Sequence, residues 1–99
     1  MLIIHVTYEV KEGKREAFLK KLAELQVAEK SRAEAGNVDY TYYLPIDGSN
    51  TLFLAEVWES AEAQAAHTQA EHFKALAAIK AEYVDKTELL WYDGAVKKE

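Results

Sequence analysis

Apolar and polar residues alternate over residues 2–10, which is the two-residue period of a β-strand with one buried face. Valine, isoleucine, threonine and tyrosine favour strands and supply most of this segment. His5, Thr7 and Glu9 fall on the polar face. The apolar face then holds Leu2, Ile4, Val6, Tyr8 and Val10.

After Gly13 the apolar period lengthens to that of a helix. From Lys14 onward, apolar residues recur every three or four positions while lysine and glutamate fill the opposite side. This pattern predicts one long amphipathic helix, closed by a C-terminal cap at Gly36. The predicted apolar stripe is Phe18, Leu22, Leu25 and Ala28.

Two further strands are predicted in the middle of the chain. Residues 38–44 alternate again and stop at Pro45, and the turn-forming residues 47–50 lead into a strand over residues 51–59, so a hairpin is expected. The later strand has apolar residues on both sides, so both of its faces are expected to be covered. One side carries Phe53, Ala55 and Val57, and the other carries Leu52, Leu54, Glu56 and Trp58.

The remaining segment predicts two helices and a last strand. Ser60 is a good N-cap for a short helix over residues 61–67, and a second helix is expected over residues 71–81 after a kink at Gln69 and Ala70. Residues 84–92 form the final strand, before a charged tail. This strand places Leu89 and Trp91 on one side and Leu90 and Tyr92 on the other.

The predicted order, βαββαβ, is that of the ferredoxin-like α+β fold, in which helices cover one face of a four-stranded antiparallel sheet. The other face is expected to hold Leu52, Leu54 and Trp58, together with strand-two tyrosines. Exposed apolar surface costs about 25 cal/mol per Å². A symmetric homodimer that pairs the two open sheets is therefore expected.

Composition narrows the class of protein. A chain of 99 residues allows a single domain over residues 1–99. The net charge of −5 argues against nucleic-acid binding, and the absence of cysteine excludes disulfides, thiolate metal sites and cysteine nucleophiles. The sequence shows neither a signal peptide nor an apolar run long enough for a membrane span, so a soluble cytoplasmic protein is expected.

Most cofactor and nucleophile motifs are missing. His67 and His72 are five residues apart, which does not place two ligands on one face of a continuous helix, so no metal site is expected. The serines lack the Gly-x-Ser-x-Gly frame of a nucleophile elbow. The four glycines are too dispersed for a phosphate-binding loop, so no nucleotide or flavin cofactor is expected.

The informative segment runs from Glu56 to Phe73. Glu56 lies among apolar neighbours, so its carboxylate either accepts a structural hydrogen bond or has a raised pKa. His67 is the best acid–base candidate, because an imidazole titrates near neutrality, although a lone helical histidine is usually inert. Trp58 and Trp91 are either core residues or a platform for an aromatic ligand.

A βαββαβ chain with Glu56-x-Trp58-Glu59-Ser60, His67 and His72-Phe73-Lys74 resembles the antibiotic biosynthesis monooxygenase domain family, especially its quinol monooxygenase-like members. The resemblance implies a dimeric α+β barrel that oxidises a quinol or polyketide-type phenol with O2, without metal or flavin. It implies that His67 is the base or its hydrogen-bond partner, and that Glu56 orients His67 or a substrate hydroxyl. The substrate would be bound by Trp58, His72, Phe73 and either Tyr40 or Tyr42.

Three functions are alternatives to quinol oxidation. Haem-degrading relatives carry an asparagine on the first strand, a tryptophan near the place of His67 and a ligand histidine near Ala77, and this chain has none of them. The branch that isomerises a small phosphorylated sugar-like signal, of the autoinducer-2 processing type, also resembles the segment from His67 to His72, but no cationic cluster for a phosphate is evident. A non-catalytic homodimer that binds a hydrophobic small molecule remains open.

Overall fold

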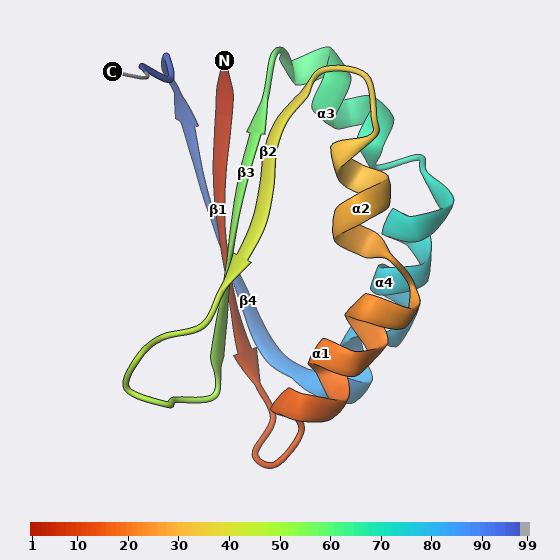
Figure 1. Ribbon diagram of the computed structural model, residues 1–99, viewed down its shortest axis with the longest axis vertical. Helices are drawn as coiled ribbons and strands as arrows, with labels where there is room; N and C mark the ends of the chain where they lie inside the picture. Colours follow the sequence, from red (N-terminus) through yellow and green to blue (C-terminus); the bar gives the residue numbers. More distant parts are fainter. Residues whose placement is uncertain (98–99) are drawn as a thin grey trace.

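The computed structural model describes residues 1–97. Four antiparallel strands form one sheet in the order β2-β3-β1-β4, and all four helices lie on the same face of it (Figure 1). The ferredoxin-like α+β prediction is confirmed. In chain order, the elements are β1 (Leu2–Val10), α1 (Arg15–Glu24), α2 (Val27–Arg32), β2 (Asn37–Tyr43), β3 (Thr51–Trp58), α3 (Ala61–His67), α4 (Glu71–Tyr83) and β4 (Val84–Asp93).

The expected single long helix is wrong, because the chain forms two helices there. Gln26 separates α1 from α2 and adopts a left-handed backbone conformation with φ 54°. The apolar stripe continues across this break: Phe18 and Leu22 are buried in α1, and Val27 and Ala28 are buried in α2. The hydrophobic pattern therefore identified the buried face correctly but could not show the change of helix axis.

Strand register decides which side chains face the helices. Residues directly opposite in an antiparallel pair point to the same side, and β3 pairs with β1 so that Trp58 lies opposite Leu2 and Glu56 lies opposite Ile4. The prediction that Leu52, Leu54 and Trp58 lie on the open face is wrong, because this register places them under the helices. Tyr40 and Tyr42 also lie on the helix side, since they pair with Glu56 and Leu54.

The open face of the sheet carries a row of aromatic rings that crosses all four strands. Tyr43 on β2, Phe53 on β3, His5 on β1 and Tyr92 on β4 follow one another with ring centroids 6.1, 5.3 and 5.2 Å apart. Tyr43, Leu90 and Tyr92 are 51%, 48% and 46% exposed. The apolar open face expected from the sequence therefore exists. Of the residues expected on it, a strand-two tyrosine, Tyr43, is present, whereas Leu52, Leu54 and Trp58 are not.

Among the described residues, no helix is long and apolar enough to cross a membrane.

Candidate active site

A cavity of about 310 Å³ lies between the helix-facing side of the sheet and the helices α3 and α4. This volume falls at the lower end of the range for small-molecule sites, about 300–1,000 Å³. The walls are mainly apolar, and a few polar side chains interrupt them. The lining residues are Ile4, Val6, Tyr8, Glu56, Gln64, His67, Thr68, Phe73, Lys80, Thr87, Leu89 and Trp91.

His67 is the last residue of α3 and lies at the wall of this cavity. The helix begins where predicted, because the side chain of Ser60 accepts a hydrogen bond from the Ala63 amide. His67 is only 3% exposed. Its ring packs at centroid distances of 4.7 Å from Trp58, 5.2 Å from Phe73 and 5.7 Å from Tyr40.

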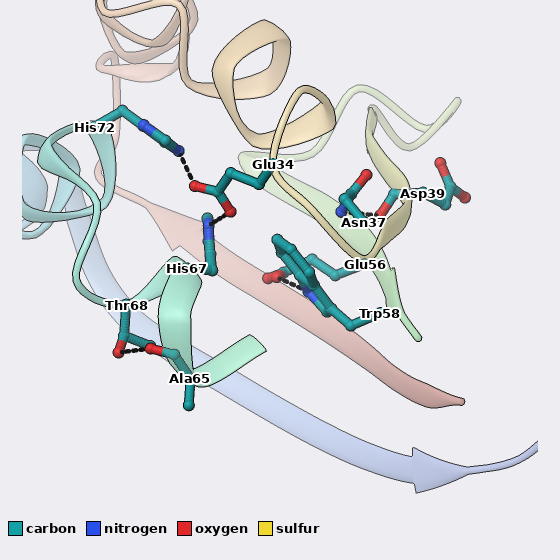
Figure 2. Close-up of polar contacts among 9 residues, drawn as sticks. All are labelled: Glu34, Asn37, Asp39, Glu56, Trp58, Ala65, His67, Thr68 and His72. Carbon is teal, nitrogen blue, oxygen red and sulfur yellow. Dashed lines mark hydrogen bonds and ion pairs between the residues drawn. The ribbon is translucent and has the colours of Figure 1, made fainter. Parts of the chain in front are cut away.

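Glu34 links His67 to His72, as Figure 2 shows. Oε2 of Glu34 lies 2.7 Å from Nδ1 of His67, and Oε1 lies 2.6 Å from Nε2 of His72. The first contact is a hydrogen bond, whereas the second is a close approach of two buried atoms that lacks hydrogen-bond geometry. An ionised carboxylate only accepts hydrogen bonds, so Nδ1 of His67 is the donor and Nε2 is left for a ligand.

The turn between α2 and β2 places Glu34 beside α3. The Glu34 amide donates to the Ser31 carbonyl at 3.1 Å, and the Asn37 amide donates to the Glu34 carbonyl at 3.2 Å. Gly36 has φ +82°, and a Cβ built on it would lie 2.5 Å from the Cβ of Ala63 in α3. Only glycine allows the turn to approach the helix this closely, so Gly36 fixes how near Glu34 comes to His67.

Burial and Glu34 act in opposite directions on His67. Burial lowers the pKa of the His67 imidazole, and the neighbouring Glu34 carboxylate partly offsets that shift. The net direction is downward, so the ring is neutral at pH 7. A neutral imidazole whose Nδ1 is held by a carboxylate carries its lone pair on Nε2, which is the arrangement of a general base.

Glu56 has a different partner from the one expected. Its Oε1 accepts a hydrogen bond from Nε1 of Trp58 at 3.0 Å, and the residue is 7% exposed (Figure 2). Burial raises the pKa of the Glu56 carboxyl, and the hydrogen bond from Trp58 opposes that shift. The structural hydrogen bond anticipated for Glu56 is present, whereas the orientation of His67 comes from Glu34.

The structure places the predicted site residues in four different surroundings. His67, Glu56 and Phe73 line the cavity. Trp58 and Tyr40 are fully buried and pack around the His67 ring rather than lining the cavity. Tyr42 lines a separate cavity with Leu19 and Leu22, and His72 contacts Glu34.

Sequence reasoning missed Glu34, Tyr8 and Lys80. Glu34 lies in a turn 33 residues before His67, where no local spacing links the two. Tyr8 was assigned to the buried face of β1, but alternation alone does not distinguish a core residue from a cavity wall. Lys80 lies near the end of α4, and a lysine in a helix is usually exposed to solvent. Nothing in the sequence therefore indicated that it lines a cavity.

Glu34, His67 and His72 also form a set of possible metal ligands. One ligand atom from each lies within 4.8 Å of the others, and two imidazoles with a carboxylate suit Zn²⁺ or a similar ion. A spacing of five residues would keep the two histidines apart on one continuous helix. They approach each other here because the helix breaks between α3 and α4. Pairing alone explains the contact of His67 with Glu34, whereas Oε1 of Glu34 and Nε2 of His72 are buried without a hydrogen-bond partner.

The chain therefore combines a ferredoxin-like fold with a buried carboxylate–histidine pair at the wall of a mainly apolar cavity of small-molecule size. Residues 1–79 match the family model described as antibiotic biosynthesis monooxygenase, and the chain belongs to this family.

Three similar proteins illustrate the relationship. The Bacillus subtilis (strain 168) protein named "Putative monooxygenase YcnE" is 32% identical over 78 residues, which cover 79% of this chain and 80% of the relative. A solved structure from Nitrosomonas europaea, described as a "Putative antibiotic biosynthesis monooxygenase", superposes with a TM-score of 0.87 at 25% identity, over 97% of this chain and all of that one. A structure of PA3566 from Pseudomonas aeruginosa has the same fold, with a TM-score of 0.86 at 23% identity over 96% of this chain and 94% of the other.

Proposed function

We propose that this protein is a cofactor-independent monooxygenase that oxidises a quinol or polyketide-type phenol with O2. The observation that carries the proposal is the His67–Glu34 pair, which aligns a neutral imidazole at the wall of an apolar cavity. Family membership supports a monooxygenase in general, and the identity of the substrate is part of the proposal.

His67 starts the reaction as a general base. Nε2 takes the proton of a phenolic hydroxyl, and Glu34 stabilises the imidazolium that forms. The phenolate then transfers one electron to O2, and the resulting superoxide and phenoxyl radical combine into a peroxide on a ring carbon that bears hydrogen. The proton held by His67 passes to this peroxide.

Loss of water completes the oxidation. The O–O bond breaks, hydroxide leaves with the ring C–H proton, and the carbon becomes a carbonyl. One phenol and one O2 therefore give one quinone and one water, with no external reductant. The apolar walls favour this route because an aromatic ring bound against them displaces water from around the reactive phenolate.

Phe73 is proposed to contact the aromatic ring of the substrate, since it lines the cavity beside His67. Trp58 and Tyr40 are proposed to act by packing around the His67 ring, and His72 by contacting Glu34. Glu56 also lines the cavity and is proposed to accept a hydrogen bond from a substrate hydroxyl. Tyr42 lies in a separate cavity and is not assigned a role in substrate binding.

The protein is further proposed to be a homodimer joined through the open face of the sheet. An apolar patch with several half-exposed aromatic side chains is typical of a protein interface. A twofold axis would place the same row of rings on both protomers.

The test is oxygen uptake by metal-stripped protein with a panel of hydroquinones and naphthalene-diols, measured against autoxidation without protein. We expect uptake above the autoxidation rate, falling about 10²- to 10⁴-fold in His67→Ala, because this is the usual contribution of a general base. Glu71→Gln, an exposed change at the start of α4, is the matched control and should not alter the rate. Unchanged uptake in a folded His67→Ala variant would remove His67 from the mechanism.

Tight binding of these compounds without oxygen uptake would instead identify a binding module.

A further inference from the structure

Lys80 is the cationic side chain in the wall of the cavity, among the residues that the structure describes. It projects from α4, is half-buried, and its Nζ lies 5.5 Å from the centre of the Tyr8 ring. Burial of an ammonium is costly, and at Lys80 it lowers the pKa of the side chain. A half-buried lysine in the wall of a mainly apolar cavity can therefore gain from an anionic partner there.

Among the described residues, no carboxylate lies within 4 Å of the Lys80 ammonium. Their ion pairs join Arg15 to Glu16, Lys21 to Glu24, and Glu34 to the two histidines. Glu56 acts on Lys80 through its charge from a greater distance, and its Oε1 accepts the Trp58 hydrogen bond. The contact with Tyr8 is a cation–π contact and leaves the N–H donors of the ammonium unused.

Lys80 and His67 stand over different parts of the sheet. Lys80 lies above Tyr8, toward the end of β1, whereas His67 packs on Trp58, which is paired with the first residue of that strand. Apolar and aromatic side chains lie between these two polar groups, including Ile4, Val6 and Phe73, and the Glu56 carboxyl lies opposite Ile4 on the neighbouring strand. The cavity is thus mainly apolar between Lys80 and His67, with one carboxyl group in its wall.

We propose that the cavity takes an aromatic acid, whose ionised acidic group pairs with Lys80 while a ring hydroxyl at the other end faces His67. The proposal deepens the function proposed above by specifying the substrate class. An ammonium and an anionic oxygen form a charge-assisted hydrogen bond, which is strong in an apolar cavity. The acidic group is either a carboxylate or a phosphate ester, and the two share this recognition chemistry.

Binding is measured by titration calorimetry without O2, so that no turnover contributes. The probes are a hydroxynaphthoate with its hydroxyl and carboxylate on opposite rings, and the corresponding neutral hydroxynaphthamide. We expect the carboxylate to bind at least about tenfold more tightly than the amide, the effect of one charged hydrogen bond. In Lys80→Met this preference should disappear through weaker carboxylate binding, while the affinity for the amide stays within about twofold.

Lys80→Arg should keep the preference, and Lys74→Met, an exposed change on the same helix, should leave both affinities unchanged. A naphthyl phosphate distinguishes the two anions: if it binds more tightly than the carboxylate and depends on Lys80, the acidic group is a phosphate ester. Equal binding of carboxylate and amide, a preference that survives Lys80→Met, or no binding of either probe at millimolar concentration would overturn the proposal.

The binding measurement does not depend on oxygen uptake. Lys80-dependent binding without turnover would support the aromatic-acid proposal and contradict the monooxygenase proposal. Turnover of neutral quinols, without any preference for acids, would support the monooxygenase proposal and contradict the aromatic-acid proposal.

Discussion

Nδ1 of His67 lies 2.7 Å from a carboxylate oxygen of Glu34, although the two residues are 33 positions apart in the chain. The bond fixes the orientation of a buried ring and determines which nitrogen carries the proton. It also assigns the turn between α2 and β2 a part in the site, which no feature of the turn sequence suggested.

Glu34→Gln should lower oxygen uptake by at least tenfold, because an amide can donate to Nδ1 and stabilise the wrong tautomer of His67. In the double variant with His67→Ala, the Glu34 change should have no further effect, since both residues act as one unit. Steady-state rates of the wild type, the two single variants and the double variant test this. Multiplicative losses in the double variant would show that Glu34 acts independently of His67.

The pH dependence of turnover should follow His67. Its pKa is held below the ordinary value of 6.5, mainly by burial, and only the neutral ring can accept a proton. The rate corrected for autoxidation should therefore fall as the pH decreases through this lowered pKa and should have levelled off by pH 7 to 8. A rate that is still rising between pH 7 and pH 8 would contradict a base with this pKa.

Gly36→Ala should destabilise the fold more than Gly48→Ala. Both glycines have positive φ, +82° and +74°, so both substitutions incur backbone strain of about 1 kcal/mol or more. Only at Gly36 would the new Cβ meet another atom, the Cβ of Ala63, and such overpacking costs about 1–3 kcal/mol in addition. Urea unfolding of the two variants measures the difference.

Adding Ala63→Gly to Gly36→Ala removes the clash but places glycine inside a helix, so it should recover part of the loss. If both single glycine variants are equally stable, the close approach does not constrain the turn.

Leu90→Asp should convert the proposed dimer to a monomer. Leu90 is half-exposed on the open face, and two buried carboxylates at a twofold interface would repel each other. Light scattering at micromolar concentration measures the mass, and Ala81→Asp on the exposed side of α4 is the matched control. A wild-type protein that is already monomeric would refute the dimer.

Removal of metal should leave turnover unchanged. The hydrogen bond between His67 and Glu34 forms without an ion, and the proposed reaction needs only Nε2 of His67. Protein dialysed against EDTA is therefore expected to retain its full rate. Loss of activity that one equivalent of Zn²⁺ restores would show that the three residues form a metal centre.

Local patterns predicted the elements well. The alternation over residues 2–10 gave β1 with its bounds, and Ser60 placed the start of α3, because strand period and N-capping depend on neighbouring residues. The faces of β3 and the partner of His67 depend on register and on a distant turn. Glu56 was expected to orient either His67 or a substrate hydroxyl, and it is Glu34 that contacts the ring, while Glu56 accepts a hydrogen bond from Trp58. Such contacts arise from tertiary packing, which the pattern of one segment does not contain.

Side chains alternate along β1 and β3, so even-numbered and odd-numbered residues of these strands serve different surfaces. Even-numbered positions such as Ile4, Val6 and Glu56 line the cavity, whereas odd-numbered positions such as His5 and Phe53 form the open face. Substitutions at the even-numbered positions could therefore change ligand preference, and substitutions at the odd-numbered positions could change subunit association. An insertion of one residue in either strand would exchange the two sets and damage both properties at once.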